Sequence, residues 1–537
     1  MLLIVFLGVG GRLDAQVVGP IAWDSVQGVS SPRLFGINVW DGTDPNVSAQ
    51  PGYASKLAAV SPGPVRIHSV ETLIPGNQKA WVDSSFEWQP QTIDAVLSNV
   101  SPVVGELMLN VPRWPSMWNE SGSSRLDPSR YTDYADFVAE LLDIANNQLG
   151  HDVGWIEPFN EVDPLYDGNT AELATIHNAV VAAARAVDPD IKIGAGAWLQ
   201  PFDDTDIRQF VNAVGAANMD AFTYHHYATS SVSTDRNFLY DRAASGSSSV
   251  AGRGRAVRDI LDDLPGGDSV ELWLSETNVY SSFDKDTTGL MAGGAGAVWD
   301  ALLHASAIRR GDVDVIQPWN DSDGTYGKFT PDASQLRPAG HVRELMASLM
   351  VGEWVTAFSF APDDLQVFAV VEGDRHAAML INRSGAPLDV ELSGFSTNGF
   401  MDQFEVHTVD DSGLSIDNES ISSHGGLSFA LGADSVQFVV FTERLAGDYN
   451  GDGLVGAIDY TIWRDTLGSV TELAADGDND GEVTLADYDV WRDNFGASAS
   501  GESVTIPEPT ALIQLLAVAL VAAFAYRVCR AQGRANG

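Results

Sequence analysis

Two glutamates, Glu161 and Glu276, each follow a short apolar segment that has the character of a β-strand. Glu161 ends the segment Trp155–Glu161 and is preceded by Asn160, whereas Glu276 ends the segment Glu271–Glu276. Cleavage of a glycosidic bond needs two carboxyl groups in one cleft. One donates a proton to the leaving oxygen, and the other attacks or stabilises the sugar cation. The pair therefore predicts a glycosidase.

Secondary-structure elements must position this pair of glutamates, and predicted strands and helices alternate along the chain. Eight short apolar segments predict strands: Leu34–Trp40, Pro64–Ser69, Glu106–Val111, Trp155–Pro158, Ile191–Ala195, Ala221–His225, Glu271–Ser275 and Val315–Pro318. The segments between them carry apolar residues at three- and four-residue spacing and predict helices. Eight strand–helix units predict an α/β fold, a (β/α)8 barrel, whose chemistry lies at the C-terminal ends of the strands. Both glutamates stand at such ends, after the fourth and seventh strands.

Several motifs resemble the clan A glycoside hydrolases, a retaining barrel superfamily, over residues from about 30 to 445. Asn160-Glu161 resembles the acid/base motif, and Glu276 in Leu-Ser-Glu-Thr-Asn resembles the nucleophile. Val65-Arg66-Ile67-His68 is similar to the Arg-x-His of family 39, and His225-His226-Tyr227 is similar to the His-x-Tyr of several families. The usual Trp-Asn-Glu-Pro is Phe-Asn-Glu-Val in this chain.

The resemblance implies a role for each matching residue. Glu161 holds a proton at rest, Glu276 stays ionised, and Asn160 donates to the sugar 2-hydroxyl. Tyr227 and Arg66 are expected to donate hydrogen bonds to Glu276, with an ion pair inside the barrel as the alternative for Arg66. The remaining expected substrate contacts are His68, His225 and Trp319, and catalysis needs no metal.

Aromatic side chains follow several of the predicted strands. Because sugar rings present C–H faces that stack on aromatic planes, such residues predict a carbohydrate cleft, although each could instead pack in the core. They are Trp40, Trp114, Trp118, Trp198, Tyr280 and Trp319.

Beyond Met350 the pattern changes to strands that alternate apolar and polar residues up to Phe441, separated by Gly, Asp and Asn turns. This period predicts a β-sandwich. Its expected role is structural, packed against the barrel, and carbohydrate binding is the alternative.

An internal repeat with an offset of 28 residues follows the sandwich. Oxygen ligands at positions 1, 3, 5 and 12 with Gly at position 6 are typical of calcium loops. The expected Ca²⁺ ligands are Asp448, Asn450, Asp452, Leu454 and Asp459 in the first loop, and Asp476, Asp478, Asp480, Glu482 and Asp487 in the second. Asp at position 12 and one helix after each loop resemble a type I dockerin. The resemblance implies a small all-α module with structural calcium and a cohesin-like or cell-surface partner.

Composition narrows the class of partner. The net charge is −43, from 30 basic and 73 acidic residues, which argues against nucleic acid as a partner. Cys529 is the single cysteine, so no internal disulfide can form.

Both ends of the chain predict export. Residues 1–15 resemble a signal peptide with an apolar run and a small residue before the cleavage point. Pro507-Glu508-Pro509, an apolar segment from Ala511 to Tyr526 and an arginine-containing tail together resemble the PEP-CTERM sorting signal. The resemblance implies transient membrane anchoring and a cell-surface or extracellular location. A buried C-terminal helix is the alternative.

The sequence thus predicts six parts: 1–15 signal peptide, 16–345 barrel, 346–445 sandwich, 446–498 dockerin-like repeats, 499–508 linker and 509–537 anchor. Residues 17–30 are able to join the sandwich. The predicted function is an exported retaining β-glycosidase acting on plant or algal polysaccharide or oligosaccharide. The alternative is a non-catalytic carbohydrate-binding or scaffold protein on a degenerate barrel.

Overall fold

The computed structural model describes residues 17–199, 201–281, 289–393, 404–419, 427–442, 445–478 and 480–498. The predicted signal peptide and the segment 499–537 lie outside the described residues. Within the described part of the chain, no helix combines the length and apolar character that a membrane crossing requires. The chain divides into two compact units, the first comprising Met1–Phe395 with Gln403–Phe441, and the second Ser396–Asp402 with Thr442–Gly537.

The first unit contains a parallel eight-stranded sheet whose strands follow one another in chain order. The strands are β2 (Ile37–Val39), β3 (Val65–Ile67), β4 (Leu107–Asn110), β5 (Trp155–Glu157), β6 (Lys192–Trp198), β7 (Ala221–His225), β8 (Glu271–Thr277) and β9 (Val315–Pro318). A parallel bridge between Phe35 and Ile316 joins the last strand to the first. This closure confirms the predicted (β/α)8 barrel.

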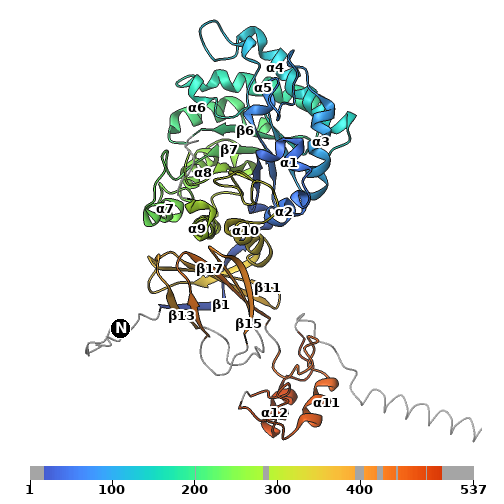
Figure 1. Ribbon diagram of the computed structural model, residues 1–537, viewed down its shortest axis with the longest axis vertical. Coiled ribbons are helices and arrows are strands. Elements are labelled where there is room, and N and C mark those ends of the chain that lie inside the picture. Colours follow the sequence, from blue (N-terminus) through green and yellow to red (C-terminus); the bar gives the residue numbers. More distant parts are fainter. Residues whose placement is uncertain are drawn as a thin grey trace, which may run out of the picture. The chain divides into compact units, whose positions relative to one another are not determined.

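Helices surround the sheet, so the strands are buried on both faces, as expected of a parallel barrel (Figure 1). They are α1 (Pro45–Ser48), α2 (Tyr53–Val60), α3 (Pro90–Val100), α4 (Tyr131–Leu142), α5 (Thr170–Val187), α6 (Asp204–Val214), α7 (Arg236–Ala244), α8 (Gly254–Asp262), α9 (Gly294–Arg310) and α10 (Pro338–Leu349).

Bulky side chains fill the N-terminal end of the barrel interior. Trp155 and Trp273 lie against each other with ring centroids 4.4 Å apart. Arg33 covers both rings and pairs with Glu106 at 2.5 Å and Glu271 at 2.6 Å. This end is therefore closed, and the interior can admit a ligand from the C-terminal ends of the strands.

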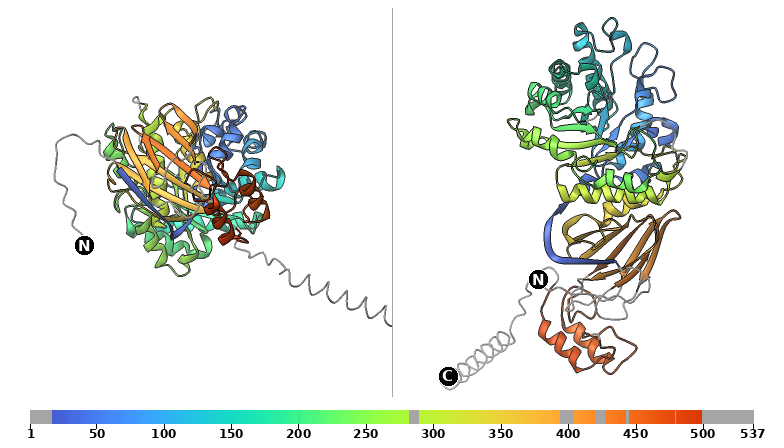
Figure 2. Two further views of the ribbon diagram at one scale, coloured as in Figure 1. Left: turned by 90° about the horizontal axis from the view of Figure 1, so that it is seen from below. Right: turned by 90° about the vertical axis from the view of Figure 1, so that its left-hand side faces the viewer.

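Nine hydrogen-bonded strands form the sandwich, and β1 is an interior strand rather than an edge strand. Its strands are β1 (Val17–Ser30), β10 (Gly352–Ala357), β11 (Leu365–Glu372), β12 (Arg375–Asn382), β13 (Leu388–Ser393), β14 (Phe404–Asp410), β15 (Gly413–Glu419), β16 (Leu427–Leu431) and β17 (Ser435–Thr442). Figure 2 shows β1, in blue, beside the yellow and orange strands, and it pairs with both β10 and β13. The first 14 described residues thus belong to this domain rather than to the barrel.

Specific polar contacts join the sandwich to barrel helices. Asp434 accepts a hydrogen bond from Tyr240 of α7 at 2.8 Å and pairs with Arg236 at 2.7 Å. Asp411 caps the start of α9 by accepting from the backbone N–H of Gly294 at 2.6 Å. These contacts fix the sandwich to α7 and α9, in keeping with a structural role.

The described part of the second unit contains two helices, α11 (Ala457–Thr466) and α12 (Leu485–Asn494), which lie side by side in Figure 2. Internal symmetry relates its two halves. Trp463 donates to the Thr484 carbonyl, and Trp491, 28 positions later, donates to the carbonyl of Gly456, the equivalent of Thr484; both distances are 2.7 Å. The repeat seen in the sequence is thus a structural duplication with a shared aromatic core.

Candidate active site

Glu161 and Glu276 meet at the C-terminal end of the barrel, where both carboxyl groups contact the same nitrogen of a histidine. Glu276 lies on β8, whereas Glu161 lies in the loop after β5 with a left-handed φ of 53° and donates its backbone N–H to the Ala197 carbonyl at 2.9 Å. His225 Nδ1 is 2.8 Å from Glu161 Oε1 and 2.7 Å from Glu276 Oε2. A carboxylate oxygen of each glutamate and the imidazole nitrogen all lie within 4.8 Å of one another.

The two carboxyl groups have different environments. The Glu276 side chain is 7% exposed and that of Glu161 is 30% exposed, so Glu161 is the more accessible of the two carboxyl groups. Burial opposes ionisation of Glu276, but the charge and hydrogen bond of His225, with His68 and Arg66 nearby, lower its pKa to about 2. Glu276 is therefore ionised at neutral pH.

His225 is held as a cation by its neighbours. Although burial alone would lower its pKa, the charge of Glu276 and hydrogen bonds to Glu161 and Glu276 raise the pKa of His225 to about 9. Burial, the charges of both glutamates and a hydrogen bond to Glu276 raise the pKa of Tyr227 well above its usual range, so its hydroxyl remains a donor. His225 is thus the main group that holds Glu276 ionised, and Tyr227 donates a hydrogen bond to the same carboxylate.

The raised pKa of His225 predicts a pH-dependent stability. Because the pKa rises from 6.5 to about 9 on folding, the stabilisation is complete below pH 6.5 and is lost as pH rises towards 9. The free energy of unfolding of the wild type, relative to His225→Gln, is expected to fall by on the order of 3 kcal/mol over this window. Urea titrations of both proteins at a series of pH values measure this stability difference. A difference that does not change with pH would contradict the raised pKa of His225.

His226 is a matched control with the opposite sign. Burial, together with Arg242 and Arg253, lowers its pKa from 6.5 to about 4. The stability difference between the wild type and His226→Gln should therefore be constant above pH 6.5 and should shrink as pH falls towards 4.

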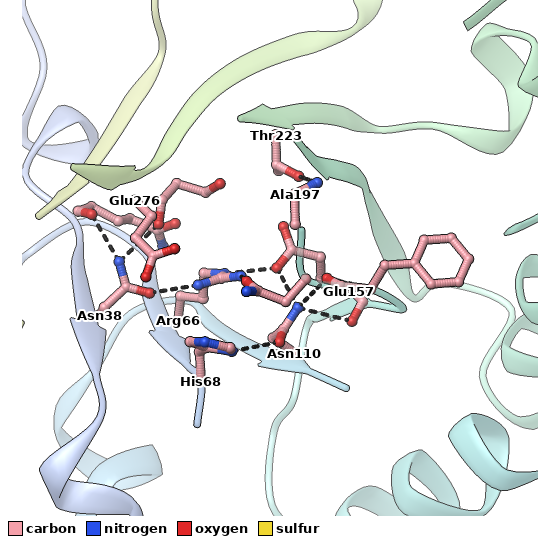
Figure 3. A network of polar contacts seen from close by, with 12 residues as sticks. Asn38, Arg66, His68, Asn110, Glu157, Ala197, Thr223 and Glu276 are labelled. Atoms are coloured by element: carbon pink, nitrogen blue, oxygen red, sulfur yellow. Dashed lines mark hydrogen bonds and ion pairs between the residues drawn. The ribbon is translucent and has the colours of Figure 1, made fainter. Parts of the chain in front are cut away.

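Arg66 is the centre of a buried polar network, shown in Figure 3. It donates to Glu157 at 2.7 Å, to Asn38 at 2.8 Å and to Asn160 Oδ1 at 2.7 Å. The expectation that Arg66 donates to Glu276 is therefore wrong, and the ion pair inside the barrel is the role observed. Because Arg66 occupies Oδ1 of Asn160, the Nδ2 group of that amide is left to donate to a ligand.

Glu157 is expected to be essential for stability. Its side chain is fully buried and accepts hydrogen bonds from Arg66 and from Asn110, both at 2.7 Å. Glu157→Gln leaves the Arg66 cation buried without a counter-charge, so we expect a loss of about 3–5 kcal/mol in the free energy of unfolding. Asp133→Asn is the control, because its pair with Arg130 is 43% and 50% exposed and should contribute below about 1 kcal/mol. Equal losses in denaturant titrations would contradict this role.

His68 and Trp319 lie together on the side of the site formed by β3 and β9. His68 Nδ1 donates to Asn110 Oδ1 at 2.7 Å, and burial with the nearby Arg66 lowers the pKa of His68 to about 3, so the ring is neutral. The Trp319 ring lies 5.5 Å from that of His68 and 5.8 Å from that of Trp40. The three rings of His68, Trp319 and Trp40 thus form one contiguous aromatic group.

Not all of the predicted cleft aromatics are in the cleft. Trp114, Trp198 and Tyr280 are at most 3% exposed and pack in the core, so they offer no face to a sugar. Trp40 and Trp118 are half-buried. The sequence could not separate the aromatic residues of the core from the half-buried ones, because each of them follows a predicted strand.

Two site residues were missed by the sequence reasoning. Asn38 donates to the carbonyls of Ser275 and Gln317, both at 2.8 Å, and Asn110 joins His68 to Glu157. The sequence did carry a signal for both residues. Each is an amide residue in an otherwise apolar parallel strand, where a buried polar side chain needs hydrogen-bond partners.

The predicted calcium loops bring their acidic side chains inward. Asp448 accepts from the backbone N–H groups of Gly451 at 2.8 Å and Gly453 at 2.8 Å, and the equivalent Asp476 accepts from Gly481 at 2.9 Å. Carboxylate oxygens of Asp476, Asp478 and Asp487 lie within 4.8 Å of one another. Burial and the charge of Asp487 raise the pKa values of Asp476 and Asp478. Converging anionic oxygens of this kind suit a hard cation.

The fold and the carboxylate pair together define a class: a (β/α)8 barrel with a β-sandwich and two glutamates at the C-terminal face. No protein-family model and no curated protein sequence matches the chain. Solved structures with a similar fold include three enzymes. A GH39 enzyme from Xanthomonas axonopodis pv. citri is 13% identical with a TM-score of 0.57, over 81% of this chain and 99% of that one.

Two further solved structures have a comparable degree of structural similarity to the chain. A GH30 endoxylanase from Clostridium papyrosolvens C71 is 17% identical with a TM-score of 0.52, over 80% of this chain and 100% of that one. A β-xylosidase from Caulobacter crescentus CB15 is 15% identical with a TM-score of 0.55, over 80% of this chain and 99% of that one. The likeness shows that the chain shares the fold of these proteins.

Proposed function

We propose that the chain is an exported retaining β-glycosidase that cleaves plant or algal polysaccharide or oligosaccharide. The observation that carries the proposal is the position of Glu161 and Glu276, whose oxygens lie within 4.8 Å of each other at the open end of the barrel. Retaining enzymes hold the two carboxyl groups about 5–5.5 Å apart, whereas inverting enzymes hold them about 6.5–9.5 Å apart to admit a water.

The proposed reaction has two displacements. Glu276 attacks the anomeric carbon while Glu161 gives its proton to the leaving oxygen, so the glycosidic bond breaks and a glycosyl ester forms on Glu276. Glu161 then removes a proton from water, the water oxygen attacks the same carbon, and Glu276 leaves as a carboxylate. Two inversions restore the original anomeric configuration.

The neighbouring side chains have defined roles in this scheme. His225 and Tyr227 keep Glu276 ionised and oriented before it attacks. Asn160, fixed by Arg66, presents Nδ2 to the 2-hydroxyl, an interaction that strengthens in the transition state. Trp319 supplies the apolar face against which the sugar bound to Glu276 stacks.

The competing proposal is a carbohydrate-binding protein without activity. The intact Glu161–His225–Glu276 arrangement disfavours it, because a binding protein has no use for a buried ionised nucleophile.

A substrate screen tests the proposal. Aryl β-xylosides, β-glucosides and β-galactosides, with plant and marine polysaccharides, should include at least one substrate that is hydrolysed at the same rate with and without a chelator. Polysaccharide binding without any turnover would overturn the catalytic proposal in favour of the binding protein. Loss of turnover in chelator would instead indicate that Glu161, His225 and Glu276 hold a metal ion.

The remaining modules are proposed to place this activity outside the cell. Residues 446–498 would hold structural calcium and bind a cohesin-like or cell-surface partner, and the terminal segments would direct export and transient membrane anchoring. Support for this comes from the sequence resemblances and, for calcium, from the converging oxygens of Asp476, Asp478 and Asp487.

A further inference from the structure

Strand β6 is irregular at its C-terminal end. Between Ala195 and Trp198 its pairing with β7 is shifted, because β6 has one residue more than its partner there. Such an insertion is a β-bulge, a feature that is common next to active sites. The two residues of this bulge have a positive φ, 114° at Gly196 and 42° at Ala197. A residue with a Cβ rarely adopts this conformation, so the surrounding structure must hold Ala197 in it.

A buried hydroxyl on the neighbouring strand holds the bulge. Thr223 of β7 accepts a hydrogen bond from the Ala197 N–H at 2.7 Å, as Figure 3 shows, and donates to the Ala195 carbonyl at 3.3 Å. Thr223 and Ala197 are both fully buried. A Cβ on Gly196 would lie 2.9 Å from the Thr223 carbonyl oxygen, so the bulge packs closely against β7. Because a buried N–H without an acceptor is costly, the hydroxyl stabilises this backbone path.

The bulge in turn holds the loop that carries the acid/base. The Ala197 carbonyl accepts a hydrogen bond from the Glu161 N–H at 2.9 Å, and Glu161 itself has a left-handed φ of 53°. A second hydrogen bond ties the same loop to the end of β6, from the Leu199 N–H to Asp163 Oδ1 at 2.9 Å. The backbone of Glu161 therefore depends on where the bulge places the Ala197 carbonyl.

Strand β7 fixes Glu161 from two directions. Thr223 and His225 are two positions apart on this strand, so their side chains lie on the same face. His225 Nδ1 contacts Glu161 Oε1 at 2.8 Å, whereas Thr223 acts on the Glu161 backbone through the bulge. The carboxyl end and the backbone of the acid/base are thus held by neighbouring side chains of one strand.

We propose that Thr223 is a positioning residue for the acid/base Glu161. Its hydroxyl holds the β6 bulge, and the bulge holds the left-handed backbone from which the Glu161 carboxyl reaches the leaving oxygen. The proposal rests on the proposed function. A displacement of about 1 Å caused by a remote mutation can cost about a hundredfold in rate, and proton transfer requires hydrogen-bond distance. Loss of the hydroxyl therefore acts on the step that needs a proton.

The test compares two aryl β-glycosides of the preferred sugar that differ only in the leaving group. Phenolate needs a proton to leave, whereas dinitrophenolate does not, and kcat/KM reports the first displacement for both. Thr223→Val keeps the branched shape and removes the hydroxyl. It should lower kcat/KM at least about tenfold for the phenyl glycoside and less than about threefold for the dinitrophenyl glycoside. Thr223→Ser retains a hydroxyl and should stay within about threefold of the wild type on both substrates.

Ser61→Ala is the control for the loss of a buried hydroxyl. Ser61 is fully buried before the N-terminal end of β3 and donates to the Phe35 carbonyl at 3.0 Å, at the opposite end of the barrel from Glu161. This variant should lose stability in urea titrations but leave both values of kcat/KM unchanged.

A second variant covers the case in which Thr223→Val does not fold. The double variant Thr223→Val with Ala197→Gly places glycine at the left-handed position, which removes the backbone strain there. The N–H of residue 197 still lacks its acceptor, so the selective loss on the phenyl glycoside should persist.

The kinetic comparison distinguishes failure of this role from failure of the proposed function. Equal losses on the two glycosides, wild-type rates in a folded variant without the hydroxyl, or a Thr223→Ser variant as impaired as Thr223→Val would overturn the positioning role and leave the proposed function in place. If the wild type cleaves neither glycoside, the proposed function fails and the positioning role fails with it.

Discussion

Glu276→Ala is expected to lower kcat on aryl β-glycosides at least about a thousandfold, because the variant lacks the carboxylate that is proposed to form the covalent intermediate. Azide should restore turnover, since a small anion fits the space of the lost carboxylate and attacks from the same face. The product is then the α-glycosyl azide. A stopped assay with product analysis by NMR measures both effects.

Glu161→Ala should behave differently from Glu276→Ala. Substrates with good leaving groups need no proton, so their glycosylation step should be spared, whereas natural linkages should lose most of their turnover. Glu120→Ala, a half-buried glutamate on the loop after β4, is the control and should retain wild-type rates on all substrates. Equal losses for both glutamate variants across every leaving group would show that the roles are assigned wrongly.

Removal of calcium is expected to unfold residues 446–498. This segment has 12 acidic and 2 basic residues, and its described core consists of Tyr449, Trp463, Ala475 and Val483 with a few half-buried aromatic neighbours. So small a core rarely offsets the conformational entropy of about 50 residues, and the convergent carboxylates repel one another without a cation. Circular dichroism of the fragment should show a helical spectrum in calcium and a largely disordered one in chelator.

Matched variants sharpen the calcium experiment. Asp487→Asn alters the last ligand of the second loop, which also caps α12 through the Thr484 N–H, and should weaken calcium-induced folding. Asp489→Asn, on the same helix but paired at the surface with Arg492, should not. The activity of the full chain should be unchanged in chelator. Identical spectra with and without calcium would count against the dockerin-like assignment.

The positions of the barrel strands and the pairing of the two glutamates were predictable because they depend on local patterns. Each strand is a short apolar run, and the parallel arrangement brings the ends of distant strands together regardless of the sequence between them. The convergence of Asp476, Asp478 and Asp487 was predictable for a similar reason, since these residues lie within twelve positions of one another.

The hydrogen-bond partners of Arg66 were not predictable, because they depend on side chains that come from several different strands. Arg66 on β3 could face Glu276 or Glu157, and the choice depends on how Asn38 and Asn110 satisfy the remaining donors and acceptors. By contrast, the place of β1 in the sandwich was among the predicted possibilities for residues 17–30, and the structure shows it paired with β10 and β13.

The central claim is that Glu276 is the nucleophile of a retaining glycosidase. Incubation with an activated 2-deoxy-2-fluoro β-glycoside of the preferred sugar should slow the second displacement and trap the glycosyl-enzyme. Mass spectrometry of the intact chain and its peptides is predicted to show one added fluoroglycosyl group, on Glu276. Inactivation with the label on another residue, or the absence of a covalent adduct in an enzyme that turns over, would contradict the account.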